Sequence, residues 1–124
     1  MLLDNTYPDK EIRERYRFNR ENIGYICDLL YDDLARDTMR NQALSVPTIV
    51  HAGLRFLATN SFQQVIGDVV GIHRSTTCKA VHEFSEALCR HKGEFIVFPC
   101  GDEERAFIKR GCYELAGIPG VVGL

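Results

Sequence analysis

The stretch that decides the fold is residues 63–82, QQVIGDVVGIHRSTTCKAVH. It has the pattern of two short helices joined at a glycine, as in a helix-turn-helix. Gly67 supplies a small residue where the second helix would cross the first. Gly71, four positions later, suits a turn that needs a positive φ. The stretch therefore predicts two helices packed at an angle near the centre of the chain.

Apolar side chains are expected to fill the angle between these two helices. The inward positions of the pair are Ile66, Val70, Ile72, Thr77, Ala80 and Val81. Two residues fit the pattern less well. Thr77 brings a hydroxyl to a position that favours a branched apolar side chain, and His73 is a weak N-cap for the second helix.

The same register predicts an outward face on the second helix. Its members are Arg74, Ser75, Cys78, Lys79 and His82, and Thr76 beside Ser75 adds a second hydroxyl. Arginine and lysine bind guanine edges and phosphates, and hydroxyl groups bond to phosphate or base. These six residues are the candidate DNA-binding residues, and Lys79 is the favoured phosphate contact.

The charge of the chain is unevenly distributed. Fifteen basic and seventeen acidic residues give a net charge of −2 over 124 residues, so any surface for nucleic acid must be local. Residues 73–92 carry four basic and two acidic side chains, and residues 10–20 carry five basic and two acidic ones. Acidic residues gather at 28–37 and 102–104. The distribution predicts a two-sided molecule.

The rest of the chain reads as helical. Apolar spacing and capping residues predict six helices, over about 8–17, 19–34, 45–59, 61–70, 74–90 and 102–117. Ser61 to Gln64 fits a capping box, Asp102 is expected to cap the last helix, and Gly117 to end it. Short extended segments are expected at 95–99, laid on the core, and at the C-terminus. The fold class predicted is all-α, with five to six helices and a central helix-turn-helix.

Composition excludes several classes of protein. Apolar residues make up 45% and charged residues 26%, as in a soluble globular domain. No apolar run approaches the roughly 20 residues of a membrane span, and the N-terminus lacks the basic start of a secretory signal. Five cysteines without a Cys-x-x-Cys pair favour reduced thiols. We therefore expect a protein of the nucleus and cytoplasm with no membrane partner.

Other groups of residues give weaker signals for a metal site, a nucleophile or a phosphate-binding loop. Cys78 and His82, four apart with Cys89 and His91 nearby, could begin a zinc site, but they have no Cys-x-x-Cys partner. His51 is expected to be a packed or surface histidine, and no cysteine stands out as a nucleophile. No glycine-rich phosphate loop is present, so we expect no metal, cofactor or small-molecule substrate for this chain.

Four segments together carry a resemblance to a known family. They are RERYRFNRENIGYICDLL (13–30), LRFLATNSFQQVIGDVVGIHRSTTCKAVHEFSEAL (54–88), FP (98–99) and IKRGCYELAGIPGVVG (108–123). In this order they resemble the N-terminal region of Harbinger transposase-derived nucleases, in the PIF/Harbinger group of DDE transposases. The resemblance implies a DNA-binding helical region ahead of a metal-dependent nuclease domain. Thr77 and Asn60 depart from the apolar residue and the glycine that the family pattern suggests.

The resemblance also implies where catalysis would lie. In the family, the PGVVG run leads into the first catalytic strand, and a metal-binding aspartate follows; here only Leu124 follows Gly123. We thus expect a helical domain over 1–117 and the start of a nuclease-domain strand over 118–124. The catalytic acids that hold divalent metal would be missing, so this chain would not itself be an enzyme.

Three functions follow as hypotheses. The leading one is a DNA-binding helical module without nuclease activity of its own. The second is the front part of a metal-dependent nuclease acting on phosphodiester bonds. The third is a protein–protein adaptor, because the family resembles one half of a two-protein system whose other half is a Myb-like partner.

Overall fold

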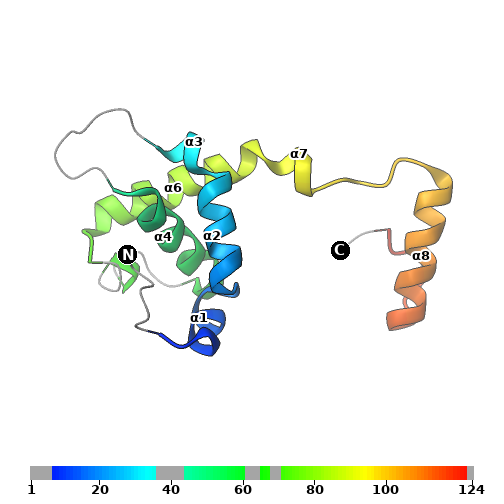
Figure 1. Cartoon of the computed structure of the whole chain (residues 1–124). Helices are drawn as coiled ribbons and strands as arrows, with labels where there is room; N and C mark the ends of the chain where they lie inside the picture. Colours follow the sequence, from blue (N-terminus) through cyan, green and yellow to red (C-terminus); the bar gives the residue numbers. More distant parts are fainter. Residues whose placement is uncertain (1–6, 36–43, 61–64, 68–70, 123–124) are drawn as a thin grey trace. The chain divides into compact units, whose positions relative to one another are not determined.

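The computed structural model describes residues 7–35, 44–60, 65–67 and 71–122, and within them the secondary structure is helical, with no strand. Figure 1 shows the helices in chain order. The chain forms two compact units, Met1–Arg90 and His91–Leu124. The all-α fold class is confirmed, whereas the boundary expected after residue 117 stays a prediction.

The first unit begins with three helices, α1 (Asp9–Tyr16), α2 (Arg20–Leu29) and α3 (Tyr31–Leu34). Asn19 caps α2, since its Oδ1 accepts the Asn22 amide proton at 2.8 Å. The single helix expected over 19–34 is wrong, because Leu30 leaves the helical region with φ −94° and ψ 2°. Leu30 is fully buried, and the bend there lets both Leu30 and Leu34 reach the core.

Two longer helices form the centre of the unit. The helix α4 (Val46–Thr59) begins at the Ser45 cap and ends at Asn60, which takes the left-handed conformation at φ 50°. The helix α6 (Arg74–Arg90) has the bounds that the sequence predicts. These two helices make the most extensive contact in the unit, and α1, α2 and α3 pack on α4.

The hydrophobic core lies where these helices meet. Its largest fully buried side chains come from every part of the first unit: Ile12, Ile23, Leu30, Ile49, Val50, Ile66, Thr77 and Phe84. Phe84 of α6 and Ile49 of α4 are both wholly excluded from solvent. The buried face of α6 is therefore fixed by the core, and this sets which of its residues face outward.

The second unit begins with a helical turn that the sequence does not predict. A one-turn helix, α7 (Lys92–Phe95), takes the first residue of the segment expected to be extended. His91 supports this turn, since its Nδ1 lies 3.0 Å from Glu94 Oε1. The extended stretch therefore begins at Ile96 and not at Phe95, whereas the packing of this segment on the core stays a prediction.

The helix α8 (Asp102–Ala116) begins differently from the prediction but ends as predicted. Gly101, with extended φ and ψ, is its N-cap, so Asp102 belongs to the acidic first turn. There its negative charge interacts favourably with the helix dipole. Gly117 ends the helix at φ 66°, and a turn with Gly120 at φ 81° follows. The expected C-terminal strand is not formed by the described residues up to Val122.

The described residues hold seven helices with given bounds and the helical residues 65–67, rather than five or six helices, because of the break at Leu30 and the added turn at α7. The capping box at 61–64 lies outside the described residues, as does Val70. In the described ranges, no helix combines the length and apolar character that a membrane crossing would need.

Candidate nucleic-acid interface

The start of α6 is held by a close crossing at Gly67. Residues 65–67 are helical, and a Cβ on Gly67 would come 2.5 Å from the Ile72 carbonyl oxygen and 2.9 Å from Thr77 Oγ1. The Ile72 amide donates to the Gly67 carbonyl at 2.8 Å, and Gly71 between them has φ 77°. Both glycines therefore serve as the sequence predicts, one at a close approach and one at a positive φ.

The first turn of α6 is capped by His73. The Thr77 amide donates to the His73 carbonyl at 2.9 Å, which places His73 at the N-cap position. The Ser75 amide donates to Nδ1 of the His73 ring at 3.2 Å, and Ser75 Oγ lies 2.9 Å from the same atom. The sequence alone predicts only a weak cap here, because histidine is an uncommon N-cap.

Thr77, the other residue that fitted poorly, also has a partner. It is fully buried, and its hydroxyl donates to the His73 carbonyl at 3.2 Å. A buried hydroxyl with a hydrogen-bond partner costs little, so the core tolerates it.

Five of the six candidate residues lie on one side of α6, and Thr76 lies next to the buried side. Arg74, Ser75, Cys78, Lys79 and His82 are exposed, and Thr76 is half-buried. Arg74, Cys78 and His82 recur every four residues and so lie one above another along the helix. The buried residues of α6 lie on the opposite side: Thr77, Ala80, Val81, Phe84 and Ala87.

The charged residues of α6 divide into two groups. Arg74 and Lys79, in its first two turns, make no ion pair with any residue in the described ranges. Further along, His82 Nε2 lies 3.4 Å from Glu86 Oε1, and Arg90 Nη1 lies 3.0 Å from Asp33 Oδ1 of α3. The cationic groups that remain available to a ligand therefore belong to the N-terminal half of the helix.

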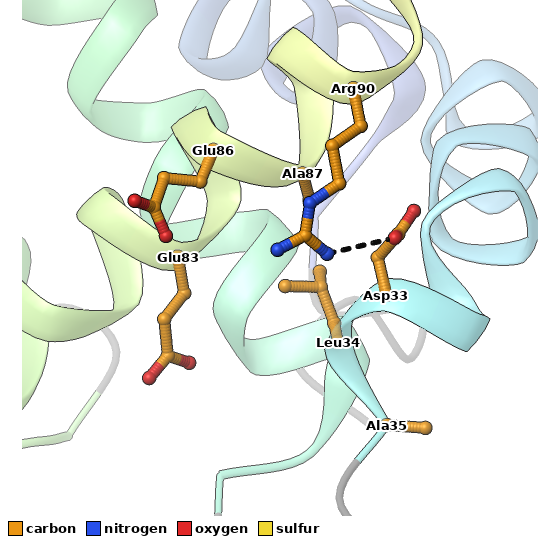
Figure 2. A pocket seen from close by; sticks show the side chains of 7 residues that line it. All are labelled: Asp33, Leu34, Ala35, Glu83, Glu86, Ala87 and Arg90. Carbon is orange, nitrogen blue, oxygen red and sulfur yellow. Dashed lines mark hydrogen bonds and ion pairs between the residues drawn. The ribbon is translucent and has the colours of Figure 1, made fainter.

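The C-terminal half of α6 carries a different surface. A pocket of about 140 Å³ lies between it and α3. Figure 2 shows Arg90 joined to Asp33 at one side of it, with Glu83 and Glu86 along the helix. Its seven lining residues include three carboxylates and one guanidinium. This surface is acidic, so it would repel a polyanion such as DNA. The surface along Arg74 and Lys79 would attract one.

The cysteine and histidine residues of α6 do not assemble a metal centre with their neighbours. Across the part of the chain that the structure describes, no three His, Cys, Asp or Glu side chains come close enough to share a metal ion. All five cysteines are free thiols, and Cys78 is among the exposed ones.

Curated proteins of three vertebrates are similar to this chain. It is 37% identical over 116 residues to proteins named "Putative nuclease HARBI1" from Bos taurus and from Homo sapiens, which covers 94% of this chain and 33% of each relative. The relative of the same name from Xenopus laevis is 38% identical over 109 residues, which covers 88% of this chain and 31% of that protein. The chain thus spans about a third of the length of the curated relatives it matches.

These similarities confirm the predicted resemblance to the Harbinger transposase-derived nucleases. No protein-family model and no solved structure matches the chain.

Proposed function

We propose that this relative of the Harbinger transposase-derived nucleases is a DNA-binding helical module that contacts duplex DNA through the outward face of α6. One observation carries the proposal. Arg74 and Lys79 are exposed, make no ion pair within the described ranges, and project from a helix whose opposite face is buried in the core. A helix anchored on one side can enter a major groove with the other, as the second helix of a helix-turn-helix does.

Each residue of the face has its own role in this proposal. Lys79 binds a phosphate, and Arg74 binds a phosphate or a guanine edge. The hydroxyls of Ser75 and Thr76 bond to phosphate or base, whereas Cys78 packs against the groove. His82 contributes least, because its ring already lies 3.4 Å from Glu86.

The test is a titration of the 124-residue chain with a labelled mixed-sequence duplex at several salt concentrations. We expect a dissociation constant of about 10⁻⁴–10⁻⁶ M near physiological salt, which rises steeply as salt is added, because each neutralised phosphate releases counterions. Replacing Arg74 and Lys79 together by alanine should weaken binding. It should also flatten the slope of log K against log salt by about 0.9 for each lost contact.

Arg90→Ala is the matched control for the double variant. It removes an exposed guanidinium from the same helix, but one that is already paired with Asp33. We expect its affinity and slope to equal those of the unchanged chain. A salt-insensitive titration, or a double variant with the original slope, would overturn DNA binding and favour a protein partner such as a Myb-like protein.

A second function is supported by the relatives themselves. They are named as nucleases, and the matched region is about a third of their length. In this alternative, carboxylates outside residues 1–124 hold the divalent metal, and the present chain positions the DNA without cutting it. Sequencing the transcript beyond codon 124 tests it. A continued frame with an aspartate-bearing strand and later acids supports the alternative, and an immediate stop overturns it.

A further inference from the structure

The hydrogen bonds of His73 define the protonation of its ring. Nδ1 lies 3.2 Å from the Ser75 backbone nitrogen, which is a donor only. Nδ1 must therefore be the unprotonated nitrogen that accepts this bond. In a neutral imidazole the ring proton then resides on Nε2. The cap of α6 thus selects one tautomer of His73.

This tautomer leaves an N–H donor at the surface. The His73 side chain is exposed, and in the described ranges its Nε2 has no hydrogen-bond partner. The next residue is Arg74, the first cation of the proposed DNA-facing surface. Donors at the start of a recognition helix commonly bind the DNA backbone, where they fix the orientation of the protein.

We propose that His73 is a further DNA contact, whose Nδ1 caps α6 while its Nε2–H donates to a backbone phosphate. The inference rests on the proposed function, since it needs DNA along the first turns of α6. It gives the neutral ring two tasks at once. The cap holds the ring orientation, and this orientation aims the donor away from the helix.

A neutral donor leaves a different signature from a cation. Loss of Arg74 or Lys79 should flatten the salt slope, because a charged contact releases a counterion. Loss of the His73 donor should weaken binding and leave the slope unchanged. The two kinds of contact are therefore separable in one experiment.

The deciding variant is His73→Ser, measured near pH 8 with the labelled duplex. Serine keeps an acceptor for the Ser75 amide, since it is among the best N-caps, but it is too short to reach the place of Nε2. We expect the melting temperature to stay close to that of the unchanged chain, the affinity to fall roughly fivefold to tenfold, and the salt slope to stay the same. His73→Ala, which also loses the cap, should lower the melting temperature as well.

Either of two binding results would overturn the inference. One is wild-type affinity for His73→Ser, and the other is a slope that flattens as it does for a lost cation. A nitrogen-15 spectrum of the unchanged chain tests the tautomer independently of folding in any variant, and a proton on Nδ1 would contradict it. If the Arg74/Lys79 double variant weakens binding but His73→Ser does not, only this inference fails and the proposed function stands.

Discussion

Gly53 of α4 lies directly against the ring of Phe84 of α6. A Cβ built on Gly53 would come within 3.0 Å of three carbons of that ring, and Phe84 is fully buried. The two central helices therefore approach more closely than any side chain at this position would allow. Because this contact fixes how α6 sits on α4, it also fixes the direction of the proposed DNA-facing surface.

We expect Gly53→Ala to lower the free energy of unfolding by about 1–3 kcal/mol, because the added methyl must displace a packed ring. This loss should appear even though alanine favours a helix by about 1 kcal/mol over glycine. Urea unfolding followed by circular dichroism measures this loss.

Gly24→Ala in α2 is the control for Gly53→Ala. Nothing lies within 4 Å of a Cβ there, so that variant should gain about 0.5–1 kcal/mol. Equal gains in both variants would contradict the close packing.

Gly67→Ala should be at least as damaging, by about 2 kcal/mol or more. Its Cβ would come 2.5 Å from the Ile72 carbonyl oxygen, and a backbone atom cannot rotate away as a side chain does. The start of α6 would have to move, so DNA binding should weaken together with stability. Gly111→Ala in α8, where a Cβ meets nothing within 4 Å, should leave DNA binding unchanged. A Gly67→Ala chain that binds DNA as before would show that this crossing does not position the surface.

Much of the fold is predictable because its signals are local. The caps at Asn19 and Ser45 follow from a residue and its nearest neighbours in sequence, and the bounds of α6 follow from its apolar spacing. The outward face of α6 follows as well, because a helix with one buried stripe has only one direction left for its polar residues.

The features that the sequence does not predict depend on contacts between residues whose spacing in sequence gives no sign of them. The break at Leu30 reflects a buried leucine that serves the core rather than the helix period. Arg90 is paired with Asp33, which is 57 residues away in sequence. Sequence spacing therefore could not show that its charge is already neutralised by a partner. His73 is an uncommon capping residue, and it caps α6 because the Ser75 amide lies within hydrogen-bond distance of its ring.

The two local caps should differ in strength. Asn19 Oδ1 accepts the Asn22 amide proton at 2.8 Å, whereas Ser45 Oγ is 3.4 Å from the Thr48 nitrogen and also bonds Thr48 Oγ1 at 2.8 Å. We expect Asn19→Ala to cost about 1–2 kcal/mol and Ser45→Ala about 0.5–1 kcal/mol in unfolding free energy. Parallel urea titrations of the two variants compare them. The reverse order would mean that the amide distances do not govern these caps.

Acid should destabilise the chain through His51. Its ring is buried, with Nδ1 bonded to the Pro47 carbonyl, and its Nε2 has no partner among the described residues. Tyr16 packs edge-on against the His51 ring with 5.5 Å between ring centres, and the Arg55 guanidinium lies 6.0 Å from the centre of that Tyr16 ring. Burial lowers the pKa of His51, and the bond to Pro47 offsets this only in part. The folded chain therefore favours the neutral ring.

The pH dependence follows from that direction. Because the pKa is lower in the folded than in the unfolded chain, the stability from neutral His51 is complete above the unfolded value of about 6.5 and is lost as the pH falls below it. We expect the unfolding free energy to drop as the pH falls below about 7, at no more than about 1.4 kcal/mol per pH unit from this one group. His51→Phe keeps an aromatic ring against Tyr16 and should flatten the drop. His82→Gln, at an exposed position, should leave it as steep as before. Equal steepness in His51→Phe and the unchanged chain would assign the acid sensitivity to another group.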